Sequence, residues 1–186
     1  MLNTFVVYVE NKPGVLTRVA SLFRRRAFNI DSLTVGRTEK PEVSRMTIVV
    51  DADRDQALRI EAHLYKLVNV LFVENITAKS AISRDLAMIK VAATHDGRSH
   101  VLELASVFRA RVVDVGPESL TIEITGGEDK IDGLLEVLRP YGVLEMVRTG
   151  IVAMRRGAKG ASTGPSAASG DGAEPIIPDE NVSYSV

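Results

Sequence analysis

The fold is decided by the stretch ENKPGVLTRVASLFRRRAFNIDSL, residues 10–33. Pro13 and Gly14 make a turn after the apolar run 5–9, and Pro suits the entry of a helix because it has no N–H to leave unpaired. Apolar residues then recur at the spacing of one helix face, and a second strand is predicted over 29–36. The stretch therefore predicts strand, turn, amphipathic helix and strand, the first half of a βαββαβ unit.

The same order of elements occurs twice between residues 1 and 156. The first unit is completed by a strand at 44–50, a helix at 57–67 and a strand at 70–76. The second is predicted as a strand at 86–93, a helix at 101–108, strands at 112–115 and 120–125, a helix at 131–138 and a strand at 143–153. We therefore predict an α+β protein of two consecutive ferredoxin-like βαββαβ sandwiches, over 1–79 and 84–156.

One face of each predicted sheet has no helix to cover it. Strands as apolar as 5–9 and 46–50 require that this face or the sheet edge be buried against something else. We therefore expect the chain to self-associate.

The composition changes sharply near Arg156. The segment GAKGASTGPSAASGDGAEP, residues 157–175, contains almost nothing large enough to bury, so residues 157–186 are predicted to form a disordered tail. The closing IIPDENVSYSV is compatible with a docking peptide or with an unstructured end.

Charge and composition exclude several classes of partner. The formal net charge is -1 and aromatic residues make up 5% of the chain, so the sequence offers neither the basic field nor the stacking platform that nucleic acids require. With no cysteine, no disulfide or thiol chemistry is available. The opening residues lack a basic leader, and their apolar run is too short to span a bilayer. We expect a cytoplasmic protein that binds neither nucleic acid nor membrane.

The sequence contains no recognisable catalytic or metal-binding pattern. His63, His95 and His100 have no spacing that joins them into a metal site, and the carboxylates are placed as solvated charge and helix caps. Gly-x-Ser-x-Gly, Walker A and GxGxxG segments are absent from the sequence. We predict no catalytic residues, no metal and no enzymatic activity in this chain.

The opening stretch does carry groups suited to an amino acid. Gly14 lets the backbone approach a ligand, and the first helical N–H groups after it can receive a carboxylate. Asn11 and Asn29 each add an amide that can both donate and accept. These residues are also consistent with structural roles, as turn, cap and helix-ending residues. Spacing alone favours the structural roles over the ligand site.

Several segments together resemble a known family. They are NKPGVLTRV at 11–19, FNIDSLTV at 28–35, SRMTI at 44–48, KLVNV at 66–70 and EMVRTG at 145–150. In combination they resemble the regulatory (small) subunits of acetohydroxyacid synthase, also called acetolactate synthase, whose amino-terminal part is an ACT domain. The resemblance covers residues 1–156.

The resemblance implies a non-catalytic subunit that binds and activates a catalytic subunit. It would confer feedback inhibition by a branched-chain amino acid, valine being the usual effector. Thiamine diphosphate, Mg²⁺ and FAD would be carried by the catalytic partner, and none by this chain. The alternative is a free-standing ACT protein that senses an amino acid and regulates another partner.

The resemblance also implies where the effector binds. ACT domains of the family pair edge to edge as a homodimer, and the effector lies between them. By position, the polar contacts are Asn11, Gly14 and Asn29, and the nearby apolar residues are Val15, Leu16 and Ile30.

The second unit lacks these residues. Its corresponding turn, 94–98, has no Asn before Gly97, and Asp114 stands where the following strand would need Asn. We predict that it binds no effector and serves oligomerisation or contact with the catalytic subunit.

Overall fold

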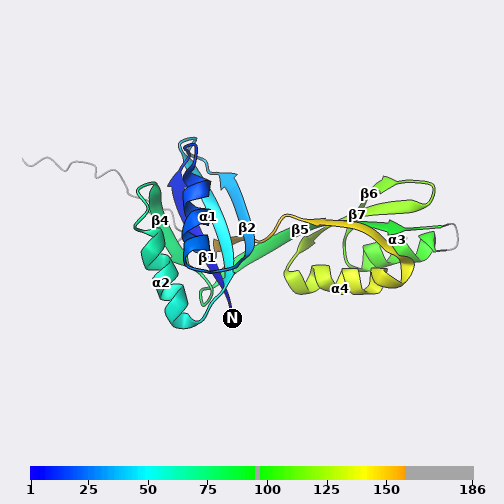
Figure 1. Ribbon diagram of the computed structural model, residues 1–186. Coiled ribbons are helices and arrows are strands. Elements are labelled where there is room, and N and C mark those ends of the chain that lie inside the picture. The colour runs from blue at the N-terminus through cyan, green and yellow to red at the C-terminus, as the bar shows by residue number, and fades with distance from the viewer. Residues whose placement is uncertain (95–96, 158–186) are drawn as a thin grey trace, which may run out of the picture.

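The first unit is a four-stranded antiparallel sheet with two helices on one face (Figure 1). The computed structural model describes residues 1–94 and 97–157. The elements of the first unit are β1 (Leu2–Glu10), α1 (Val15–Arg25), β2 (Ile30–Arg37), β3 (Val43–Asp51), α2 (Arg54–Leu64) and β4 (Val70–Asn75). Its strand order is β2-β3-β1-β4, which confirms the predicted ferredoxin-like sandwich.

The second unit repeats this arrangement with one addition. Its elements are β5 (Ala81–Ala92), α3 (Arg98–Val107), β6 (Arg111–Val115), β7 (Ser119–Gly126), α4 (Glu128–Leu138), a short 3₁₀ turn (Arg139–Tyr141), β8 (Val143–Arg148) and β9 (Val152–Arg155). The sheet order β6-β7-β5-β8 matches that of the first unit. The extra strand, β9, pairs with the first four residues of β5.

Helical spacing explains the core of the first unit. The buried side chains of α1 are Val15, Val19, Leu22 and Phe23, and they pack against the inward face of β1 and β3. The second helix, α2, begins at a capping box in which Asp53 and Gln56 each accept a hydrogen bond from the other's backbone N–H. The second unit has its own core between its sheet and α3 and α4.

The last predicted strand, 143–153, is divided in the structure. It breaks at Thr149, Gly150 and Ile151, and Gly150 has a φ of 86°, a left-handed conformation that favours glycine. Beyond the break, β9 leaves the second sheet and pairs with residues 81–84 of β5. We call residues 149–155 the strap.

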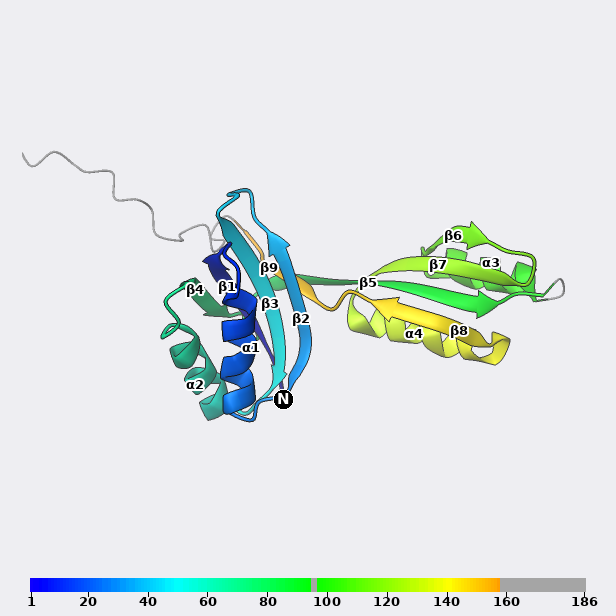
Figure 2. The same cartoon turned by 45° about the horizontal axis from the view of Figure 1, so that its top comes forward.

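The strap covers part of the face of the first sheet that the helices leave bare. Figure 2 shows β9 behind β2 and β3, on the side away from α1 and α2. Val6 and Val49 point to this side, yet they are only 2% and 1% exposed. Val6 forms a small apolar cluster with Ile76 and with Ala153 of the strap. This part of the apolar face is buried, and the chain covers it with its own strap.

The sequence also predicts a disordered tail and no membrane-spanning segment. The predicted tail, apart from Gly157, lies outside the described residues. Across residues 1–94 and 97–157, no helix has both the length and the apolar character to cross a membrane.

Candidate functional site

The turn between β1 and α1 is fastened to the loop that joins β2 and β3. The backbone N–H of Asn11 donates to the Glu42 carbonyl at 2.7 Å, and its side-chain Nδ2 donates to the Pro41 carbonyl at 3.0 Å. The Asn11 side chain is exposed, and no described residue donates to its Oδ1. Asn11 therefore has the structural role that its sequence position allowed, and one acceptor remains for a ligand.

Gly14 and the first turn of α1 form an anion-receptive helix start. Gly14 has a φ of 80°, and no side chain caps the helix. Among the described residues, the N–H groups of Leu16 and Thr17 donate to no carbonyl, and the first turn contains no acidic residue. Unpaired N–H groups at the positive end of the helix dipole attract a carboxylate. Val15 is buried below this turn, whereas Leu16 is 44% exposed beside it.

A polar network that sequence reasoning missed supports this helix start. Glu10 accepts from Asn69 Nδ2 at 2.6 Å and pairs with Lys12 Nζ at 3.0 Å. Arg18 of α1 donates to Asn69 Oδ1. The hydrogen bond from Asn69, followed by that from Lys12, holds the pKa of Glu10 below its ordinary value of 4.5. Asn69 stands within the segment 66–70 that carried the family resemblance, but nothing in the sequence pairs it with Glu10.

Asn29 and Ile30 lie at the other end of the first unit. Ile30 is level with Val50 on β3, whereas Glu10 is level with Val43. Seven residues of β3 separate these two levels, which is about 23 Å of strand. Asn29 is exposed and Ile30 half-buried against the core. Within one chain, the predicted effector residues in 11–16 therefore lie together. The predicted effector residues Asn29 and Ile30 lie far from them.

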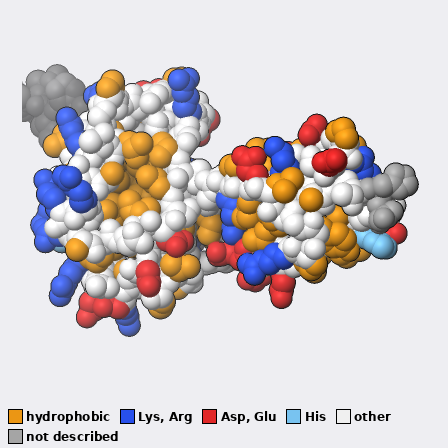
Figure 3. Space-filling view, turned by 45° about the vertical axis from the view of Figure 1, so that its right-hand side comes forward, with side chains coloured by type: hydrophobic (Ala, Val, Ile, Leu, Met, Phe, Trp, Pro, Cys, Tyr) orange, Lys and Arg blue, Asp and Glu red, His pale blue; other side chains and the backbone are white. Residues whose placement is uncertain are grey.

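The strand that begins at Ile30 is an edge strand. Within the described residues β2 pairs with β3 alone, so its other side presents unpaired N–H and C=O groups. Val35 of β2 is 43% exposed. Figure 3 turns the β2 side of the first unit toward the viewer and shows hydrophobic side chains grouped on that face. This edge is suited to pairing with another strand.

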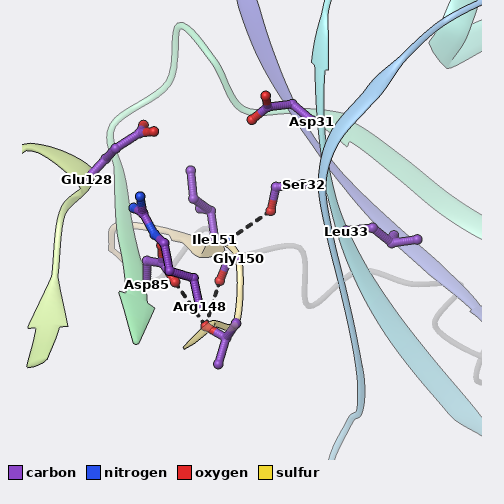
Figure 4. A pocket seen from close by; sticks show the side chains of 9 residues that line it. Asp31, Ser32, Leu33, Asp85, Glu128, Arg148, Gly150 and Ile151 are labelled. Carbon is purple, nitrogen blue, oxygen red and sulfur yellow. Dashed lines mark hydrogen bonds and ion pairs between the residues drawn. The ribbon is translucent and has the colours of Figure 1, made fainter. Parts of the chain in front are cut away.

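A polar cavity of about 450 Å³ lies where the two units meet (Figure 4). On one side are Asp31 and Ser32 of β2, and on the other are Asp85 and Arg148 of the second unit. Asp85 is 4% exposed and accepts from Arg148 Nε at 2.7 Å. Burial by itself lowers the pKa of Arg148, but the hydrogen bond and charge of Asp85 outweigh it and raise that pKa. Asp85 and Arg148 satisfy each other, and Ser32 accepts from the backbone N–H of Ile151, so these contacts form a junction between the units.

Metal-ligating residues do not gather in the part of the chain that the structure describes. No group of three or more His, Cys, Asp or Glu side chains there could hold a metal ion. His63 contacts the Arg59 carbonyl through Nδ1 at 2.5 Å. His95 lies outside the described residues.

The corresponding turn of the second unit has a different backbone. Gly97 precedes α3 with a φ of -89°, whereas Gly14 is left-handed at the start of α1. Its neighbours His95 and Asp96 lie outside the described residues. Asp114 is exposed where the register of β6 against β7 shifts. The helix start of the first unit is therefore not repeated, and the absence of an effector from the second unit stays a prediction.

Comparisons with known proteins agree over both units. Residues 5–72 match the family model described as the AHAS small subunit-like ACT domain, and residues 84–157 match the one described as the small subunit of acetolactate synthase. The probable acetolactate synthase small subunit of Archaeoglobus fulgidus is 50% identical over 159 residues, 86% of this chain and 99% of that protein. The acetolactate synthase small subunit of Mycobacterium leprae is 51% identical over 161 residues, 87% of this chain and 95% of that protein.

A solved structure supports the same relationship. The crystal structure of the acetolactate synthase small subunit from Thermotoga maritima has a TM-score of 0.79 and is 40% identical to this chain. The match covers 84% of this chain and 98% of that one. Over the matched part of the chain, the likeness thus extends to the fold as well as to the sequence.

Proposed function

Because the chain belongs to the family of acetolactate synthase small subunits, we propose that it is the non-catalytic regulatory subunit of that enzyme. It binds the catalytic subunit, raises its activity and confers feedback inhibition by a branched-chain amino acid, with valine as the first candidate. The observation that carries the regulatory part is the anion-receptive start of α1, in a unit whose edge strand β2 pairs on one side only within the described residues.

The effector site is completed by a second copy of the chain. In one protomer Arg37, at the end of β2, is level with Ser44, next to the Val43 level reached by Glu10. Antiparallel pairing of two β2 strands about a two-fold axis sets the start of one β2 beside the end of the other. This pairing brings Asn29 and Ile30 of one protomer toward the 11–16 turn of its partner.

Each part of an amino acid then has a matching group. The N–H groups of Leu16 and Thr17 receive the carboxylate, and the amide oxygens of Asn11 and Asn29 accept from the ammonium. Leu16 and the partner's Ile30 supply apolar surface for the branched side chain. One methylene changes such binding by only about 1–3 kcal/mol, so discrimination among valine, leucine and isoleucine is modest.

The catalytic chemistry belongs to the partner under this proposal. Thiamine diphosphate, Mg²⁺ and FAD bind the catalytic subunit, and this chain carries none of them. The second unit provides oligomerisation or the contact with the catalytic subunit. A chain without cysteine also suits the reducing cytoplasm, where we place the complex.

Reconstitution tests the proposal directly. The purified chain is added to the acetolactate synthase catalytic subunit of the same organism, and activity is measured across valine concentrations, with catalytic subunit alone as the control. We expect higher activity and new sensitivity to valine. Unchanged activity and sensitivity would contradict the proposal. Valine binding without any effect on the catalytic subunit would instead identify a free-standing amino-acid sensor.

A further inference from the structure

Two hydroxyl groups of β2 hold one residue of the strap. Ile151 donates its backbone N–H to Ser32 Oγ at 3.1 Å, and its carbonyl accepts from Thr34 Oγ1 at 3.1 Å. The first of these hydrogen bonds is drawn in Figure 4. A Cβ on the neighbouring Gly150 would lie 2.5 Å from Ser32 Oγ, so only glycine permits this approach. The strap is thus fitted to β2 through both polar backbone groups of one residue.

The start of the strap is fixed to the second unit. Thr149 Oγ1 donates to Asp85 Oδ1 at 3.0 Å, and the Thr149 N–H donates to the Leu86 carbonyl at 3.0 Å. Arg148, immediately before the strap, joins Asp85 to Asp132 of α4. When the second unit moves, the first residues of the strap move with it.

The end of the strap is fixed to the start of β5, by the strand pairing of β9, and also to the first unit. Arg155 pairs with Glu74 of β4 at 2.9 Å, and Glu74 also pairs with Lys79 at 2.8 Å. The Glu74 side chain is 7% exposed, so this ion pair is shielded from water. The strap therefore bridges the two units, and its middle rests on β2.

One contact under the strap is poorly satisfied. The Arg45 guanidinium donates to the Ala153 carbonyl and, at 3.3 Å, to Thr47 Oγ1. Its Nε is buried without any hydrogen-bond partner, and no described carboxylate pairs with it. The Tyr8 ring, 5.7 Å from the guanidinium carbon, offsets this in part. Arg45 as a whole is half-buried, but a buried donor nitrogen without a partner favours hydration, so lifting the strap relieves a penalty that docking imposes on this nitrogen.

Ser32 and Thr34, whose hydroxyls bind the strap, come directly after the predicted effector contacts Asn29 and Ile30 in the sequence. The register of β2 against β3 shifts between Ile30 and Ser32, which leaves Asp31 as the bulged residue. A bulge changes local twist and redirects the side chains beside it. A ligand that fixes Asn29 and Ile30 therefore also orders the position from which Ser32 reaches the strap.

We propose that the strap exchanges between docked and lifted positions on β2, and that effector binding favours the docked one. The position of the second unit relative to the first then reports whether the effector is bound. This inference rests on the proposed function, because it takes valine as the ligand at Asn29 and Ile30. Coupling of this kind is reciprocal, so weakening the docked strap must weaken valine binding by the same factor.

Two sets of variants weaken docking from opposite sides. Ser32→Ala with Thr34→Val removes both hydroxyls from β2, and Gly150→Ala blocks the strap side without touching the predicted effector residues. Thr125→Val on β7 is the matched control, since its hydroxyl has no partner among the described residues. Circular dichroism establishes that each variant is folded. Valine binding is then measured by calorimetry on the full chain.

The position of the second unit is measured by pulsed electron paramagnetic resonance. The chain has no cysteine, so Ala62→Cys on α2 and Glu103→Cys on α3, both exposed, accept spin labels specifically. Labelled chain is diluted with unlabelled chain so that distances within one protomer dominate. We expect valine to narrow the distance distribution of the otherwise unchanged chain, and both docking variants to broaden it.

The outcomes separate the two proposals. We expect both docking variants to raise the valine dissociation constant about fivefold or more, and Thr125→Val to leave it unchanged. Valine binding that leaves the distances unaltered overturns the strap inference alone. The strap inference is also overturned if Ser32→Ala with Thr34→Val lowers the affinity for valine and Gly150→Ala does not, because such a loss is local to β2. Failure of the unsubstituted chain to bind valine overturns the proposed function, and the strap inference with it.

Discussion

Gly14 is the residue whose backbone most directly shapes the proposed effector site. Its left-handed φ of 80° strains any other residue, yet apart from Gly14 and its two chain neighbours no atom of the described residues lies within 4 Å of the place where a Cβ would be. A substitution there acts through backbone strain and charge rather than through crowding within the chain. The consequences for folding and for ligand binding can therefore be separated.

We predict that Gly14→Asp weakens valine binding about tenfold or more and spares activation of the catalytic subunit. The new carboxylate stands where the effector carboxylate binds, and like charges about 4 Å apart repel by ~1 to ~4 kcal/mol between aqueous and protein-surface dielectrics. Calorimetry and valine-inhibition curves measure the effect.

Gly14→Ala is the control for this substitution. It imposes the same left-handed strain, about 1–2 kcal/mol of stability, without the charge. It is expected to retain most of the valine response. Asn29→His, at the other end of the proposed site, is expected to reproduce the loss of feedback. Equal loss of feedback and of activation in either variant would contradict the assigned site.

Glu10 gives the helix start a defined pH dependence. Its pKa is held below 4.5, so its contribution to stability is fully present above pH 4.5 and disappears as the pH falls through the lowered value. We predict that Asn69→Ala raises the pKa of Glu10, because the hydrogen bond from Asn69 is the largest cause of the lowering. Carboxyl chemical shifts followed by NMR across the acid range measure this.

The control for the Glu10 prediction is Asn75→Ala. Asn75 hydrogen-bonds Thr77 and has no contact with Glu10, so the pKa of Glu10 should not move. A Glu10 pKa that is the same with and without Asn69 would refute the network as its cause.

For the helices and strands, the spacing of apolar residues is sufficient to predict each element wherever the segment packs on its nearest neighbours. Most predicted helices and strands coincide with those of the structure to within three residues, because a buried helix face or strand face imposes its own period, but β5 begins at Ala81, five residues before the strand predicted at 86. The break at Thr149 to Ile151 was not predictable this way. Arg148, Thr149 and Gly150 interrupt the apolar residues locally, but the contacts with Ser32 and Asp85 decide that β8 ends there and the strap begins.

At the scale of the whole molecule, the unpaired β2 edge is the feature that calls for a second chain. We predict that Val35→Lys weakens the dimer about tenfold or more, since burying even a neutral polar group without a partner costs ~1–3 kcal/mol and burying an unpaired charge costs more. Sedimentation velocity across protein concentrations measures the dissociation constant. Valine binding should weaken in parallel at low protein concentration, because the site needs both protomers.

The matched control for the dimer prediction is Leu58→Lys. Leu58 is an exposed apolar residue of α2, 60% exposed, and lies away from the β2 edge. This variant should leave the association unchanged. A Val35→Lys chain that sediments like the unsubstituted one would show that the chains associate elsewhere.

Local periodicity and short motifs were enough to predict the two βαββαβ units, the helix start at Gly14 and the family. The distance of Asn29 and Ile30 from the rest of the candidate site, about 23 Å of strand within one chain, follows from the pairing of the strands. The tertiary structure also decided that Glu10 meets Asn69 and that the strap covers part of the bare sheet face. These contacts join residues 59 or more positions apart, and chain geometry rather than local pattern brings such residues together.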